Sequence, residues 1–123
     1  MDNLKLIAPA IIESIENWLE IKAATSTLAS NTRVAYHNDV TDFFIFLSEH
    51  HNETTDLSTD EKLKISDIRA WQAKLRNMNS GARSNARKLS SLKSYIRWLA
   101  KHRGFDATHI LSIKSPKFSN KLP

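Results

Sequence analysis

The stretch GARSNARKLSSLKSYIRWLAKHRG, residues 81–104, decides the fold expected for this chain. Its apolar residues recur every three or four positions, which is typical of an amphipathic helix. The stretch contains no proline, and the closing Gly104 suits the left-handed conformation that ends many helices. We therefore expect one long helix that begins at Ala82 or Arg83 and ends at about His102.

The two sides of this expected helix carry different side chains. One side is an apolar stripe that a single amide interrupts: Asn85, Leu89, Leu92, Ile96 and Leu99. The opposite side is basic and otherwise built from small hydroxyl residues: Arg83, Ser84, Arg87, Ser91 and Ser94, with Lys88 at the edge. No acidic residue occurs between Arg69 and Arg103, whereas a solvated helix normally mixes Glu with Lys. Since arginine and serine bind phosphates and base edges, we interpret this side as DNA-binding; a merely solvated surface is the alternative.

The charge of the chain is distributed unevenly along the sequence. Residues 1–65 carry five Lys and Arg against eleven Asp and Glu, a net charge of −6. Residues 66–123 carry thirteen against two, a net charge of +11, which leaves +5 for the whole chain. A cationic region attracts a polyanion through Coulomb steering and counterion release. Nucleic acid is therefore the partner that the sequence favours, ahead of an anionic membrane surface.

Length and composition favour one all-α domain. A chain of 123 residues can bury one modest core, and only two glycines and three prolines interrupt it. The longest apolar run, residues 43–47, is far shorter than the ~20 residues of a membrane span. The absence of cysteine excludes disulfides and thiolate metal sites, and it suits a reducing cytoplasm.

Further elements are expected on both sides of the long helix. Helices are predicted over residues 9–25, 30–50, 66–77 and 106–113. Ser30 or Asn31 is expected to cap the second of the helices, and Ser66 or Asp67 the third. Residues 51–65 have turn and capping chemistry without an apolar period, and they predict a polar loop. We expect residues 1–113 to form the domain and residues 114–123 to be an extended linker.

The start of the helix predicted from residue 30 is a second candidate DNA-binding surface. Asn31, Thr32 and Arg33 bring an amide, a hydroxyl and a guanidinium to a helix amino terminus, where unpaired N–H groups attract phosphate. An ordinary helix cap is the alternative. Tyr36 lies one turn further on; its ring is expected in the core, and its hydroxyl is a candidate phosphate donor.

Two other groups of residues are weaker candidates for a site. Lys114, Lys117 and Lys121 lie in the proline-flanked tail, which is expected either to follow a phosphate backbone or to serve as a plain tether. His50 and His51 are adjacent, but with no third ligand in view the sequence predicts no metal site. No cofactor is expected.

These segments resemble the amino-terminal core-binding domain of Xer-type tyrosine recombinases, and the XerC group most closely. The resemblance spans roughly residues 10–123 and is strongest in residues 30–47, 67–71, 81–99 and 116–123. It implies a four-helix SAM-like domain that forms half of a C-shaped clamp on duplex DNA. It assigns to DNA Asn31, Thr32, Arg33, Arg83, Ser84, Arg87, Lys88, Ser91 and Ser94. One departure is that residues 51–65 carry more acid than is expected beside DNA.

The resemblance also implies that DNA binding and catalysis lie in different domains. In this family a tyrosine nucleophile attacks the phosphodiester, with Arg and His stabilising the transition state, and these residues belong to a catalytic domain that would follow this chain. The chain itself is expected to bind the recombination site and to cleave nothing. The implied role is XerC-like chromosome dimer resolution at the bacterial nucleoid, in a tetramer with a XerD-like partner. The alternatives are a phage or mobile-element integrase, a helix-turn-helix transcription regulator, and a basic protein-interaction module.

Overall fold

The computed structural model describes residues 7–25 and 28–114, apart from the side chains of residues 59 and 60. Its helices are α1 Pro9–Thr25, α2 Ser30–His51, α3 Leu57–Glu61, α4 Ile65–Asn77, α5 Ala82–Arg103 and α6 Thr108–Leu111. Within those ranges there is no strand, only an isolated bridge between Ile7 and Thr55. The all-α class is confirmed. None of the helices described is long and apolar enough to cross a membrane.

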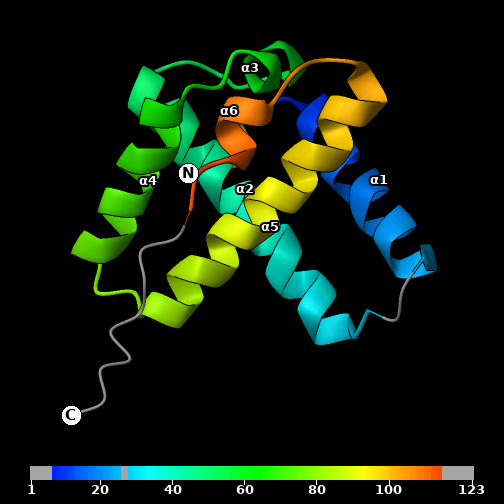
Figure 1. Cartoon of the computed structure of the whole chain (residues 1–123), viewed down its shortest axis with the longest axis horizontal. Coiled ribbons are helices and arrows are strands. Elements are labelled where there is room, and N and C mark those ends of the chain that lie inside the picture. The colour runs from blue at the N-terminus through cyan, green and yellow to red at the C-terminus, as the bar shows by residue number, and fades with distance from the viewer. Residues whose placement is uncertain (1–6, 26–27, 115–123) are drawn as a thin grey trace.

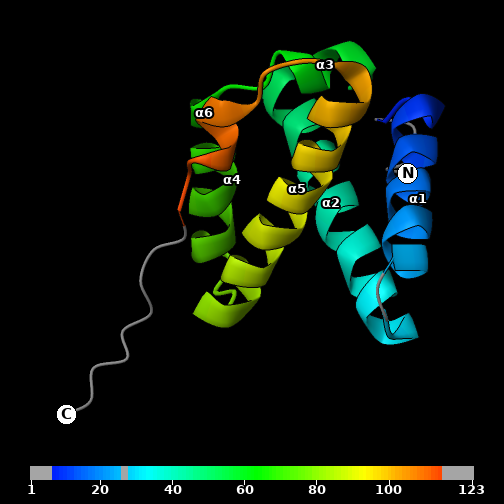
Figure 2. The same ribbon diagram turned by 45° about the vertical axis from the view of Figure 1, so that its right-hand side comes forward.

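Helices α2 and α5 cross at the centre of the molecule, with α1 on one side and α4 on the other (Figure 1). The short α6 packs against α4 and α5. The amino-terminal ends of α2 and α5 diverge from the crossing toward the lower end of the molecule, and α3 lies at the opposite end (Figure 2). The crossing therefore brings two helix amino termini to the same end of the domain.

Aromatic rings fill the core at this crossing. Phe43 on α2 meets Trp71 on α4 edge to face, with ring centroids 5.1 Å apart. Phe44 meets Tyr95 of α5 at 5.9 Å, and Trp18 of α1 meets the same ring at 5.6 Å. All five side chains are at most 3% exposed. Since such pairs add ~0.5–1.5 kcal/mol each beyond burial, this cluster holds α1, α2, α4 and α5 together.

The carboxyl-terminal end of α5 agrees with the prediction from the sequence, whereas the start of α2 does not. Gly104 closes α5 with φ of 74°, and its N–H donates to the carbonyl of Ala100 at 2.8 Å. At α2 the capping residue is Ala29, which has an extended backbone and makes no side-chain cap bond. The cap predicted at Ser30 or Asn31 is therefore wrong, because the helix begins at Ser30 itself.

A carboxylate in the first turn of α4 stabilises the start of that helix. The capping residue is Lys64, and so the cap predicted at Ser66 or Asp67 is also wrong. Asp67 is the third helical residue, and its carboxylate reaches back to accept the Lys64 N–H at 3.0 Å. This is the acidic half of a capping box, which satisfies an N–H that the helix cannot pair.

Part of the loop predicted over residues 51–65 is ordered as α3. Asp56 accepts the backbone N–H of Ser58 at 3.0 Å, which holds the first turn of this helix. Leu57 packs against the core, and Leu63 just beyond the helix is 4% exposed. A helix of five residues is too short to show an apolar period, so the sequence pattern missed it.

Candidate nucleic-acid interface

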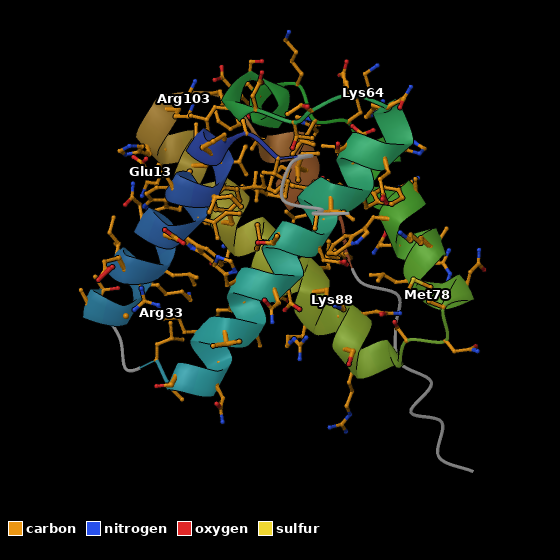
Figure 3. The ribbon with its side chains drawn as sticks, turned by 180° about the vertical axis from the view of Figure 1, so that it is seen from behind. Glu13, Arg33, Lys64, Met78, Lys88 and Arg103 are labelled. Carbon is orange, nitrogen blue, oxygen red and sulfur yellow. The ribbon has the colours of Figure 1, made fainter. Side chains whose placement is uncertain are left out.

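The candidate interface consists of the exposed side of α5 and the amino-terminal part of α2. Arg33 on α2 and Lys88 on α5 lie in the lower half of the molecule, whereas Lys64 and Arg103 lie at the far end (Figure 3). Helix amino termini carry partial positive charge, so the two diverging ends add to the charge of the side chains.

A buried carboxylate on α2 organises the basic residues of α5. Asp39 is 1% exposed and accepts two hydrogen bonds from the Arg87 guanidinium, from Nε at 3.0 Å and from Nη2 at 2.8 Å. The hydroxyl of Ser91 lies 3.0 Å from the same carboxylate, and Lys88 Nζ lies 3.5 Å from it. The hydrogen bond to Asp39 is the main cause that raises the pKa of Arg87. A two-point pair of this kind fixes the plane of the guanidinium as well as its charge.

Arg87 keeps one edge open to a ligand. Its side chain is 46% exposed, and its Nη1 has no hydrogen-bond partner among the residues described. The guanidinium therefore offers N–H groups to solvent while Asp39 holds its inner edge. This geometry fixes the orientation of the group.

The structure corrects the prediction for Ser91. This residue is 2% exposed, and its hydroxyl also lies 3.0 Å from the Arg87 carbonyl, so its place on the outer side of the helix was wrong. The reason is the crossing, because α2 covers part of the side that lies opposite the apolar stripe. Lys88 is at the edge as expected, with 20% of its side chain exposed.

Other parts of the predicted pattern hold. The apolar residues of the stripe are at most 2% exposed: Leu89, Leu92, Ile96 and Leu99. Arg83 and Ser84 are exposed, Ser94 is partly buried, and Arg83 forms no ion pair within the described part of the chain. Asn85 is partly buried, and its amide donates to the Ser80 carbonyl at 3.4 Å.

Two cations outside the predicted set continue the exposed row. Arg97 and Lys101 are exposed and follow Arg83 and Arg87 at helical spacing, with Ser90 and Ser94 between them. The row spans eighteen positions, or ~27 Å at 1.5 Å per residue. The same three-and-four spacing in the sequence would have revealed both residues.

The start of α2 supplies fewer free groups than expected. Asn31 is exposed and Thr32 is partly buried. Arg33 pairs with Glu20 of α1 at 3.4 Å, an exposed contact that a ligand can displace. The ring of Tyr36 packs against the core, stacked on a tryptophan of α1 at 6.2 Å. Lys117 and Lys121 lie outside the described residues.

Comparison with known proteins agrees with this architecture. Residues 15–103, which include α2 to α5 and much of α1, match the family described as phage integrase, N-terminal SAM-like domain. Tyrosine recombinase XerC of Rickettsia typhi is 33% identical over 114 residues, which are 93% of this chain and 37% of the relative. XerC of Brucella suis is 31% identical over 98% of the chain and 39% of the relative. XerD of Rickettsia bellii is 32% identical over 91% of the chain and 35% of the relative.

The chain thus spans less than two fifths of the length of these curated relatives. No solved structure gives a significant match. Because the family match covers the four long helices that build the crossing, and relatives match nearly the whole chain, this chain belongs to the phage integrase N-terminal SAM-like domain family.

Proposed function

We propose that this domain grips duplex DNA as the amino-terminal half of a tyrosine recombinase clamp. The observation that carries the proposal is the exposed row on α5, in which Arg83, Arg87, Arg97 and Lys101 alternate with serines and no acidic residue intervenes. Small side chains allow a helix to approach a groove closely, and the flanking cations reach its phosphates.

Shape supports a duplex over a single strand. The major groove of B-DNA is ~12 Å wide and admits one α-helix, and the row of ~27 Å is long enough to follow it. The second amino terminus, at α2, diverges from the first. We expect it to meet the neighbouring phosphates. The oriented guanidinium of Arg87 is the group that we assign to a base edge or a phosphate in the groove.

The whole protein is proposed to be a site-specific recombinase of the XerC type. Its relatives carry the name tyrosine recombinase, and this domain would position a separate catalytic unit rather than cut DNA itself. A nucleophilic tyrosine must reach the phosphodiester, but Tyr95 is buried and its hydroxyl donates to Ser14 at 3.0 Å. Chromosome dimer resolution at the bacterial nucleoid is the proposed role, with a XerD-like protomer as partner; integration of a mobile element is the alternative.

The test measures affinity for duplex DNA against salt concentration by fluorescence anisotropy. Replacing Arg83 or Arg97 by Ala is expected to weaken binding and to reduce the slope of log K on log salt by ~0.9 for each phosphate that the variant no longer neutralises. Lys62→Ala is the matched control and is expected to leave the slope unchanged, because Lys62 directly follows α3, opposite the amino termini of α2 and α5.

Arg33→Ala separates the proposal from a helix-turn-helix reader. In the clamp, α2 also contacts DNA, so this variant is expected to weaken binding. A helix-turn-helix protein that reads through one inserted helix would lose affinity only with the α5 variants. If Arg33→Ala, Arg83→Ala and Arg97→Ala all bound DNA as tightly as wild type, the proposed function would be contradicted.

A further inference from the structure

The end of the domain opposite the amino termini of α2 and α5 contains a group of histidine and carboxylate side chains that the proposed DNA surface does not include. Here the last turn of α2 meets the first turn of α4, beside the acid-rich segment that leads into α3 (Figure 1). His50 and His51 end α2, and Asp67 begins α4. No sequence pattern brings Asp67 to the two histidines, because sixteen residues separate it from His51.

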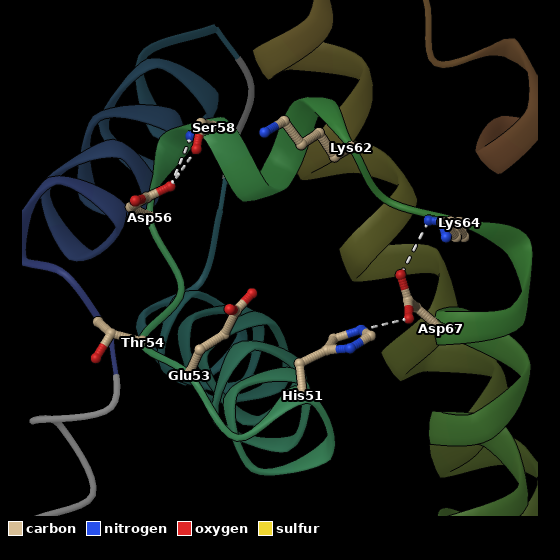
Figure 4. Close-up of a pocket in the computed structure, with 8 residues that line it drawn as sticks. All are labelled: His51, Glu53, Thr54, Asp56, Ser58, Lys62, Lys64 and Asp67. Carbon is tan, nitrogen blue, oxygen red and sulfur yellow. Dashed lines mark hydrogen bonds and ion pairs between the residues drawn. The ribbon is translucent and has the colours of Figure 1, made fainter.

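The central contact is between His51 and Asp67 (Figure 4). Nε2 of the histidine lies 2.8 Å from Oδ1 of the carboxylate. Oδ2 of the same carboxylate accepts the Lys64 N–H at 3.0 Å, and the residue is only 5% exposed. Asp67 is thus a buried carboxylate with one oxygen fixed by the backbone and the other directed at an imidazole. Such a fixed carboxylate loses little conformational freedom when it binds a cation.

His50 supplies a third donor. Its ring stacks on Phe46, one turn earlier, with centroids 5.2 Å apart, and it meets the His51 ring edge to face at 5.1 Å. One ligand atom from each of His50, His51 and Asp67 lies within 4.8 Å of the other two. Tetrahedral zinc with bonds of ~2.0–2.1 Å holds its ligand atoms ~3.3 Å apart, so a shift of up to ~1.5 Å by the exposed His50 ring, with ~0.5 Å of separation between the His51 and Asp67 atoms, closes the set.

We propose that His50, His51 and Asp67 bind one Zn²⁺ ion. Two imidazole nitrogens and one carboxylate oxygen are a donor set typical of this borderline cation. The ion would bind Nε2 of His51 and Oδ1 of Asp67 in place of their hydrogen bond; the neutral ring would keep one proton on Nδ1, and a second ring proton, where present, would pass to solvent. The carboxyl-terminal end of α2 carries partial negative charge, which favours a cation there.

The fourth position has room for water or for a second carboxylate. A hollow of about 290 Å³ adjoins the site, and Glu53 and Asp56 line it together with His51 and Asp67 (Figure 4). Lys62 and Lys64 also line this hollow, so a larger, all-oxygen cation site is disfavoured. The zinc ion would join the end of α2 to the start of α4, and it does not depend on whether the domain binds DNA.

The experiment titrates the full chain, freed of metal by a chelator, with zinc chloride in a calorimeter and with Co²⁺ as a spectroscopic probe. We expect one ion per chain, a rise in the melting temperature with zinc, and the visible absorption of tetrahedral Co²⁺. His50→Ala and His51→Ala are each expected to weaken binding by roughly tenfold or more. Absence of saturable binding would overturn the proposal.

Matched variants separate the site from general histidine binding and from loss of the fold. His37→Ala removes a partly exposed histidine elsewhere on α2 and is expected to leave zinc affinity unchanged. Asp67→Asn keeps an acceptor for the Lys64 N–H, so we expect native helicity by circular dichroism together with weakened zinc binding. Zinc affinity that survives His51→Ala, or that falls equally with His37→Ala, would show that the ion binds elsewhere.

Discussion

At the scale of single residues, Asp39 links the fold to the candidate interface. Removal of a buried carboxylate normally affects stability alone, because it leaves hydrogen-bond partners unsatisfied. Here the chief partner is Arg87, whose outer edge faces solvent on the proposed DNA surface. Under the proposed function, Asp39 is therefore a positioning residue, since it fixes the plane of the Arg87 guanidinium that would contact DNA.

Asp39→Asn distinguishes positioning from simple electrostatics. The substitution removes a negative charge beside the row of cations, so Coulomb attraction alone predicts tighter DNA binding. Because asparagine keeps only one of the two oxygens that hold the Arg87 guanidinium, the two-point pair is lost, and we expect weaker binding, on the order of tenfold or ~1.4 kcal/mol. The free energy of unfolding should also fall, by ~1–3 kcal/mol. Anisotropy with labelled duplex and urea denaturation measure the two effects.

Asp42→Asn is the control for that comparison. Asp42 lies on the same helix, is exposed and accepts a long hydrogen bond of 3.4 Å from Trp71, without touching Arg87. The Asp42→Asn substitution removes the same charge, and we expect its DNA affinity to equal or slightly exceed that of wild type. If Asp39→Asn bound DNA as tightly as Asp42→Asn, the positioning role would be refuted.

Lys93 gives the domain a predicted dependence on pH. Its pKa is lowered from the ordinary value of 10.5, mainly by burial and then by repulsion from Arg97 and Lys114. In the range just below 10.5 the unfolded chain then binds more protons than the folded one, so the free energy of unfolding rises with pH. Lys93→Met removes this contribution. The difference in stability between wild type and variant should grow in favour of wild type as the pH rises toward 10.5, whereas parallel curves would contradict the prediction.

At the scale of elements, the glycine at the end of α5 has a conformational role. Gly104 has φ of 74°, and an added Cβ would meet no atom within 4 Å. Gly104→Ala therefore costs only the strain of a left-handed alanine, ~1 kcal/mol of unfolding free energy. Gly81→Ala is the matched control, because Gly81 is also uncrowded but has φ of −68°. Urea denaturation should show the loss for Gly104 and little change for Gly81.

The elements also show which predictions a sequence supports. The long helices were predicted closely, because an apolar period sustained over several turns leaves little freedom in how a helix packs. The caps predicted at Ser30 or Asn31 and at Ser66 or Asp67 were wrong, because the capping residues are Ala29 and Lys64, whose side chains are not those of preferred caps and so gave no signal in the sequence. Ser91 was misplaced for a related reason: a single helix does not reveal which neighbour crosses its polar side. The contact between Asp39 and Arg87 spans 48 positions and left no local signal.

At the scale of the whole molecule, the exposed row on α5 contains no acidic side chain, whereas acidic residues elsewhere pair with cations, as Glu61 does with Arg103 and Glu49 with Lys74. The sequence shows the imbalance between its two halves, and the fold collects part of the excess positive charge into this one exposed row. A DNA duplex, which is uniformly negative, would be attracted to this row. Under the proposed function, the row would therefore favour one orientation of the domain on DNA.

The crossing of α2 and α5 gives the domain a mechanical property. Asp39 lies at the pivot, and nine residues of helix, ~14 Å, separate it from the tip of α2 at Ser30. Each arm acts as a rigid lever, so a rotation of ~10° at the pivot would displace that tip by ~2 Å. Repacking a few of the aromatic rings at the crossing would therefore change the distance between the two tips.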